Sequence, residues 1–130
     1  MFDYKTQIFL HHTDAAGRLF FGNQFFLTHE AFEKFLESRG LAISTMLDHP
    51  ELTFPLVHAE ADYKSVLCAG DQITIQVRVE KLGETSVTIA FIILKADGTL
   101  AGTAKTVSVA VNKHTNLKAP LPADWRQKLT

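Results

Sequence analysis

The chain has 130 residues, 46% of them hydrophobic, and this predicts a single domain over residues 1–130 with an apolar core. Its 13 Lys and Arg residues are scattered and are balanced by 14 Asp and Glu residues, which argues against a nucleic-acid partner. The single cysteine, Cys68, excludes a disulfide framework, and no signal sequence or apolar run of about 18 residues is present. We therefore expect a cytoplasmic protein that does not insert into a membrane.

The first elements along the chain are a short strand and a long helix. Residues 4–10 are rich in strand formers, and the polar, small residues 11–17 that follow predict a loop. Asn23 is a plausible N-cap, and Gly40 supplies a residue that easily adopts the left-handed conformation of a C-cap. Between them, apolar residues recur at helical spacing: Phe25, Phe32, Phe35 and Leu36. This pattern predicts a helix over residues 23–39.

After the helix, the hydrophobic period changes to two. Residues 44–53 are expected to be mostly irregular, and four strands follow at 54–64, 70–79, 85–95 and 100–111. The third of these is apolar on both faces, which indicates a central strand. Asp97-Gly98 predicts a tight hairpin turn. The tail, which contains Pro120, Pro122 and Trp125, is expected to be mostly irregular.

This order of elements predicts an α+β fold with a mostly antiparallel sheet. One helix cannot cover both faces of a sheet. The apolar face that it leaves exposed predicts self-association.

Asp14 is the first candidate for chemistry. It lies in the loop between the first strand and the start of the helix, where free N–H groups and the helix dipole favour negative charge. The same N–H groups can polarise a thioester carbonyl while water or a carboxylate attacks it. The alternative is that Asp14 only caps its own loop by accepting hydrogen bonds from the backbone.

Glu30 and the histidines are weaker candidates. A buried Glu30 on the helix could act as a base or nucleophile, although an ion-paired, solvated helix face explains the charges around it equally well. His12 and His58 could donate hydrogen bonds in a pocket, and ordinary polar packing is the alternative for both. No histidine spacing matches a zinc helix and no glycine pattern matches a phosphate-binding loop, so we expect neither a metal nor a cofactor.

The segment from Asp14 to Asn23 resembles the signature of the 4-hydroxybenzoyl-CoA thioesterase family of the hotdog superfamily. That signature is Thr-Asp-x-x-Gly followed by two hydrophobic residues and an aromatic residue, before a helix that starts near an Asn. The resemblance continues at Glu30-Ala31, Tyr63, Gly70-Asp71 and Leu121-Pro122. It thus spans nearly the whole chain.

The resemblance implies a long helix wrapped by a curved, mostly antiparallel five-stranded sheet, assembled into homodimers or homotetramers. It also implies that Asp14 is the catalytic carboxylate, as nucleophile or general base, and that the backbone N–H of Phe21 polarises the thioester carbonyl. Glu30 matches, approximately, the carboxylate of a second hotdog branch and is a backup candidate. The residues expected to bind substrate are His12, Gly17, Phe20, Gly22, Asn23, Phe25 and His58.

The sequence departs from the family pattern in three places. His12 stands where many relatives have an acidic residue, and Phe21 and Gln24 replace a His and a Tyr that are frequent in bacterial members. The turn at residues 83–85 lacks the basic run that meets the CoA phosphates in hydroxybenzoyl-specific members. Other candidates for those phosphates are Lys64, Lys81 and Lys113.

The sequence therefore predicts an enzyme that hydrolyses an acyl-CoA thioester with an aromatic or a short or medium-chain acyl group. Three alternatives remain open at this point: a thioesterase acting on acyl carrier protein, a hotdog dehydratase or hydratase, and a non-catalytic acyl-binding module.

Overall fold

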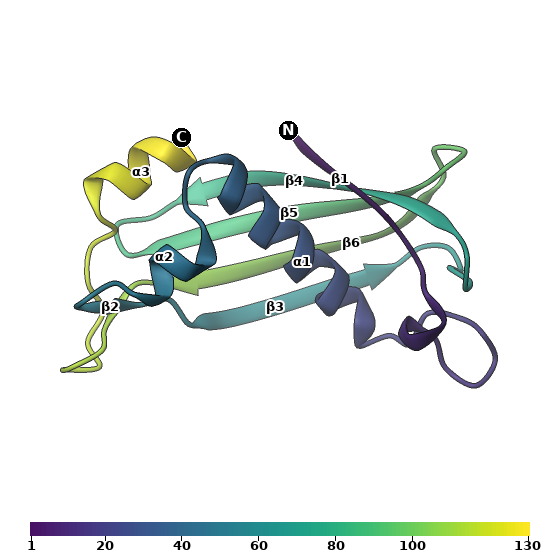
Figure 1. Ribbon diagram of the computed structural model, residues 1–130, viewed down its shortest axis with the longest axis horizontal. Helices are drawn as coiled ribbons and strands as arrows, with labels where there is room; N and C mark the ends of the chain where they lie inside the picture. The colour runs from purple at the N-terminus through teal and green to yellow at the C-terminus, as the bar shows by residue number, and fades with distance from the viewer.

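Helix α1 (Asn23–Ser38) lies across one face of a curved sheet of five antiparallel strands in the computed structural model, which describes residues 1–130 (Figure 1). The strand order is β1-β4-β5-β6-β3. The strands are β1 (Phe2–Gln7), β3 (Leu56–Tyr63), β4 (Gln72–Leu82), β5 (Ser86–Lys95) and β6 (Leu100–Val109). This arrangement confirms the predicted α+β class and hotdog fold.

The core lies between α1 and the sheet. β4 alternates as predicted and turns Ile73, Ile75 and Val77 toward the helix. β5 is central, between β4 and β6, and its apolar residues on the helix side are buried: Val87, Ile89, Phe91 and Ile93. Helix α1 contributes residues spaced three or four apart: Leu27, Ala31, Phe35 and, beside them, Phe32 and Leu36.

The sequence predicts one end of α1 correctly and the other incorrectly. Gly40 has a φ of +74°, and the N–H of Leu41 donates to the carbonyl of Leu36 at 2.8 Å, so the predicted glycine stop is confirmed. The predicted N-cap is wrong, because Gly22 occupies the cap position and Asn23 is already helical. The Asn23 amide instead donates to the carbonyl of His12 at 2.8 Å, which ties the helix to the preceding loop.

The segments expected to be irregular contain short elements, and the first strand ends early. A 3-10 turn, η1 (Leu10–His12), follows β1. The segment after α1 forms α2 (Ile43–Leu47) and β2 (Leu52–Thr53), and β2 pairs with β7 (Val111–Asn112).

The tail also differs from the prediction, because residues 123–129 form helix α3 (Ala123–Leu129). Its Trp125 and Leu129 are buried, and the indole packs edge-on against Phe54 at 5.9 Å between ring centroids. This burial stabilises a short helix that local sequence preference alone does not predict.

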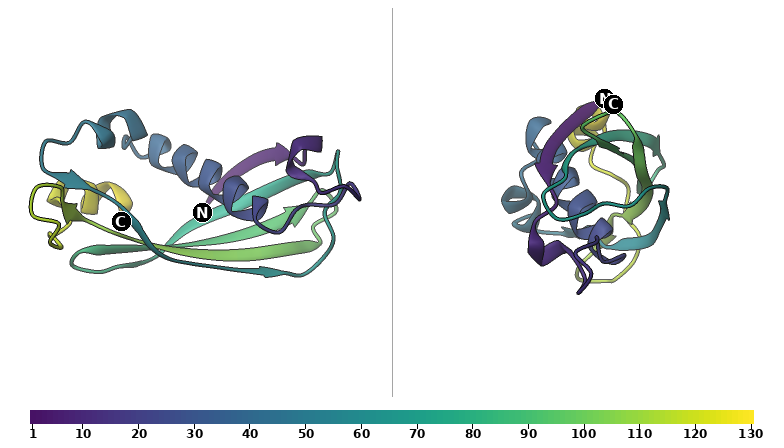
Figure 2. Two further views of the ribbon diagram at one scale, coloured as in Figure 1. Left: turned by 90° about the horizontal axis from the view of Figure 1, so that it is seen from below. Right: turned by 90° about the vertical axis from the view of Figure 1, so that its right-hand side faces the viewer.

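Two surfaces of the sheet lack cover. β3 is an edge strand, and all of its residues except Ala61 are exposed. The sheet face away from α1 carries no helix, as Figure 2 shows. No helix of the structure is long and apolar enough to cross a membrane.

Candidate active site

Asp14 lies at the base of a small loop that folds back on itself. Thr13 and Leu19 form an antiparallel bridge, and the N–H of Asp14 donates to the carbonyl of Arg18 at 2.8 Å. The Oδ1 atom of Asp14 accepts from the N–H groups of Ala16 at 2.8 Å and Arg18 at 3.3 Å. The capping role that the sequence left open is therefore real, and it uses one carboxylate oxygen. The other oxygen, Oδ2, accepts no hydrogen bond within the protein.

Backbone hydrogen bonds fix this loop against the connection between β3 and β4. The N–H of Leu19 donates to Leu67 at 2.8 Å, and the N–H of Ala69 donates to Gly17 at 3.0 Å. Gly17 has a φ of +76°, a conformation that favours glycine at this turn. The position of Asp14 is thus set by contacts with residues about 50 positions later in the chain.

A pocket of about 340 Å³, here called the Asp14 pocket, opens between these two segments. Its lining consists of Asp14, Arg18, Leu19, Gln24, Tyr63, Lys64, Ser65, Val66 and Leu67. The Asp14 side chain is exposed and lies at the wall of this pocket. Arg18 and Lys64 form no ion pair with any carboxylate of the chain, so the pocket carries two free positive charges.

The first helical turn presents unpaired amides. The N–H of Asn23 donates to Phe20 at 2.9 Å and that of Gln24 donates to Phe21 at 3.4 Å, so the turn begins at Phe20. The N–H groups of Phe21 and Gly22 have no acceptor in the protein. Such groups at the positive end of a helix can donate to an oxyanion.

Gln24 and Tyr63 belong to this region although the sequence assigned no role to either. Gln24 is only 1% exposed, and its Nε2 donates to the carbonyls of Asp62 at 3.1 Å and Thr103 at 3.0 Å. The Tyr63 hydroxyl donates to the carbonyl of Phe21 at 2.8 Å. In the sequence, the only signals were a departure from the family pattern at Gln24 and a match to it at Tyr63.

His12 is 7% exposed and braces the start of the helix rather than lining the Asp14 pocket. Its Nδ1 accepts from the N–H of Phe9 at 3.0 Å, which places the proton of the neutral ring on Nε2. Its carbonyl accepts from the N–H of Phe20 at 3.0 Å and from the Asn23 amide. Burial, reinforced by His11 and opposed by Glu30, lowers the pKa of His12 below 6.5.

This lowered pKa makes stability depend on pH. Above pH 6.5 the ring is neutral in the folded and unfolded states, and the full stability is present. As pH falls below 6.5, the unfolded chain binds a proton first, so the free energy of unfolding decreases until the folded pKa is passed. We expect His12→Asn, which keeps an acceptor near Nδ1 but cannot titrate, to flatten this decline. Urea unfolding of both proteins between pH 7.5 and 5 tests this expectation. If the free energy of unfolding declined equally in both proteins, His12 would not be the cause.

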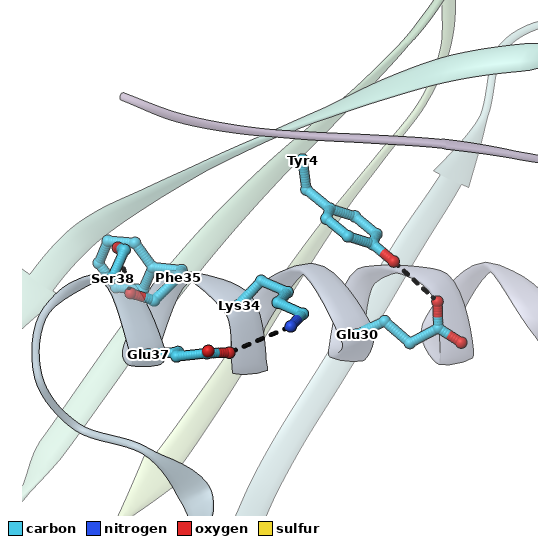
Figure 3. A network of polar contacts seen from close by, with 6 residues as sticks. All are labelled: Tyr4, Glu30, Lys34, Phe35, Glu37 and Ser38. Atoms are coloured by element: carbon cyan, nitrogen blue, oxygen red, sulfur yellow. Dashed lines mark hydrogen bonds and ion pairs between the residues drawn. The ribbon is translucent and has the colours of Figure 1, made fainter.

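Glu30 and His58 are not brought to the Asp14 pocket. Glu30 is exposed and faces β1, where the Tyr4 hydroxyl lies 3.5 Å from its Oε2 (Figure 3). His58 lies on the opposite face of β3 from Tyr63, and its Nε2 is 3.4 Å from Glu60. In this chain both side chains make exposed polar contacts.

The two phenylalanines expected to bind substrate, Phe20 and Phe25, lie in different places. Phe20 and Phe21 are exposed, the latter at 66%, and their rings lie 4.7 Å apart. Phe25 lines a separate apolar cavity of about 260 Å³ between α1 and β3. Gly22 packs close to the Phe20 ring, since a Cβ there would lie 3.1 Å from it.

The three candidate lysines for CoA phosphates are also separated. Lys64 lines the Asp14 pocket, whereas Lys113 lines a groove of about 490 Å³ beside α2 and Lys81 lies near the far end of β4. The structure has no cluster of three or more His, Cys, Asp or Glu side chains suited to a metal ion.

Comparisons with known proteins agree with this fold. The family model of the thioesterase-like superfamily matches residues 9–129. The 1,4-dihydroxy-2-naphthoyl-CoA hydrolase of Rippkaea orientalis is 34% identical over 99% of this chain and 95% of its own length.

Solved structures extend the likeness. A 1,4-dihydroxy-2-naphthoyl-CoA thioesterase from Synechocystis has a TM-score of 0.93 at 28% identity, over 98% of this chain and 94% of that one. A gentisyl-coenzyme A thioesterase has a TM-score of 0.88 at 25% identity, over 98% and 99% of the two chains. The predicted family and enzyme class are thus confirmed. The chain belongs to the thioesterase-like superfamily and is a thioester hydrolase.

Proposed function

We propose that this protein hydrolyses the CoA thioester of a hydroxylated aromatic acid, with Asp14 as its catalytic carboxylate. Relatives similar over nearly their whole length act on 1,4-dihydroxy-2-naphthoyl-CoA and gentisyl-CoA, and both names denote dihydroxylated aromatic acyl groups. This similarity favours an aromatic over an aliphatic acyl group among the alternatives that the sequence left open.

The observation that carries the proposal is a carboxylate with one free oxygen at the wall of a pocket, in the loop that leads into a helix with two unpaired N–H groups. In the general-base route, Asp14 Oδ2 takes a proton from water as the water oxygen bonds to the thioester carbon. The carbonyl oxygen becomes an oxyanion, stabilised by the N–H of Phe21 or Gly22. The C–S bond then breaks, and the thiolate of CoA leaves and takes up the proton.

In the nucleophilic route, Asp14 itself bonds to the thioester carbon, expels the thiolate and forms an anhydride that water hydrolyses. Single turnover in H₂¹⁸O tests this route, since ¹⁸O found in the Asp14 carboxylate would require water to attack the aspartyl carbon of the anhydride.

A panel of thioesters tests the proposed substrate. We expect kcat/KM to be highest for dihydroxylated aromatic acyl-CoAs, lower for benzoyl-CoA and lowest for short and medium aliphatic acyl-CoAs. Matched acyl-N-acetylcysteamine thioesters lack phosphates and test whether the free charges of Arg18 and Lys64 help to bind CoA. Preference for acyl carrier protein over CoA, or turnover of none of these compounds, would refute the proposal.

We also propose that the protein is a homodimer or a higher homo-oligomer built on β3. This edge strand has eight residues, an unpaired outer edge and exposed apolar side chains at Leu56 and Val57. Exposed edges of this kind pair readily with another strand, and a second copy offers the same edge in antiparallel orientation. Sedimentation velocity should give at least twice the mass of one chain, and a monomer at micromolar concentration would contradict this.

The rival interpretation is a hotdog dehydratase, an enzyme class that usually pairs a histidine with the helix carboxylate at the reaction centre. His12 uses Nδ1 to accept from Phe9, and Glu30 faces β1, outside the Asp14 pocket. These contacts favour hydrolysis at Asp14. Tight acyl binding without turnover would instead favour the non-catalytic binding module.

A further inference from the structure

Tyr63 connects the end of β3 to the first turn of α1. It is the last residue of β3, pairs with Gly102 of β6 and is 49% exposed at the wall of the Asp14 pocket. Its hydroxyl donates to the carbonyl of Phe21 at 2.8 Å, across 42 positions of sequence. This hydrogen bond reaches the turn whose N–H groups are unpaired.

The Phe21 carbonyl accepts two hydrogen bonds, and the one from the Tyr63 hydroxyl is the shorter. Within the helix, that carbonyl accepts only from the N–H of Gln24 at 3.4 Å, a long hydrogen bond. Without Tyr63, the peptide between Phe21 and Gly22 would have more freedom to tilt. The tyrosine therefore fixes the orientation of this peptide plane relative to the pocket.

The same contact changes the electronic character of the peptide. The Phe21 carbonyl and the Gly22 N–H belong to one amide group, and a hydrogen bond donated to the oxygen polarises the whole group. The Gly22 N–H, which has no acceptor in the protein, becomes a stronger donor. The neighbouring N–H of Phe21 is held in place through the shared α-carbon.

We propose that Tyr63 is a positioning residue for the oxyanion site, acting through the Phe21–Gly22 peptide without touching the reacting atoms. The inference rests on the proposed function, because it assumes that a thioester carbonyl accepts from this turn.

Tyr63→Phe removes only the hydroxyl and tests the inference. We expect kcat to fall about 3- to 10-fold, the size of one neutral hydrogen bond, with KM and the melting temperature nearly unchanged. The matched control is Tyr4→Phe, the same change at the only other tyrosine of the chain, which lies outside the Asp14 pocket. It should leave kcat unchanged.

A spectroscopic measurement separates positioning from a general structural role. A ketone analogue of the acyl-CoA, with CH₂ in place of sulfur, binds without being hydrolysed, and its carbonyl stretching frequency reports polarisation. We expect the downshift seen on the wild-type enzyme to shrink in Tyr63→Phe and to persist in Tyr4→Phe and Asp14→Asn.

An unchanged kcat in Tyr63→Phe, or a lower kcat with an unaltered carbonyl frequency, would overturn the inference while leaving hydrolysis at Asp14 intact. If the wild-type enzyme turns over no thioester, the proposed function fails instead. The two failures are therefore distinguishable.

Discussion

Asp14→Asn is expected to lower kcat for the preferred acyl-CoA by about 10³-fold or more, because it removes the base or nucleophile from the pocket. The amide oxygen of asparagine can still accept from the N–H groups of Ala16 and Arg18, as Asp14 Oδ1 does. The loop should therefore keep its shape. Steady-state hydrolysis measures the loss, and circular dichroism and sedimentation measure the fold and assembly.

The matched control is Asp97→Asn. Asp97 caps a turn in the same manner, since its Oδ1 accepts from the N–H of Thr99 at 2.9 Å, but it lies in the turn between β5 and β6. Its replacement should leave kcat unchanged. Equal hydrolysis by wild type and Asp14→Asn would show that Asp14 only caps its loop.

Much of the sheet could be predicted because local pattern and tertiary burial agree. In β4, every second residue from Ile73 to Val77 is apolar and buried, and the polar residues between them face away from α1. β5 is apolar on both faces because it is central. The end of α1 at Gly40 depends only on the positive φ of that residue, which glycine adopts easily. These features depend on residues close together in sequence.

The features that escaped prediction depend on partners far away in the chain. Helix α3 is stabilised by packing of Trp125 against Phe54, 71 positions earlier. Asn23 donates to the carbonyl of His12 instead of capping α1, and no local signal distinguishes these two uses of one amide. Similarly, Gln24 and Tyr63 have roles only because the chain brings α1 against the ends of β3 and β6.

The part of the candidate site that the sequence can place is the part that one short segment determines. Asp14 and the amides of Phe21 and Gly22 lie within nine residues, so the loop and the helix start bring them to one end of the fold. The surroundings of the Glu30 and His58 side chains depend instead on how α1 and β3 pack against neighbouring elements. β1 passes beside Glu30, and the alternation of β3 turns His58 away from the side of Tyr63. Periodicity gives the faces of an element but not what covers them.

Gly102→Ala is expected to lower the free energy of unfolding by about 2–3 kcal/mol, although it adds only a methyl group. Gly102 is buried on β6, where a Cβ would lie 2.8 Å from the carbonyl oxygen of Asp62 and 2.9 Å from Gln24 Nε2. Neither the Asp62 backbone nor the hydrogen-bonded Gln24 amide can move far to make room for the methyl group. The methyl group must push α1 away from the sheet or break the hydrogen bonds that Gln24 donates to Asp62 and Thr103.

A double-mutant cycle with Gln24→Ala tests whether the amide is the cause. Gln24→Ala alone destabilises the protein, because it removes the hydrogen bonds that Gln24 donates to two partly buried carbonyls. It also vacates the space that the new methyl group needs, so Gly102→Ala should cost about 1 kcal/mol less in that background, as expected for residues in contact. Chemical denaturation of the four proteins gives the coupling. Strictly additive losses would mean that contact with the Asp62 carbonyl, and not with Gln24, requires glycine at this position.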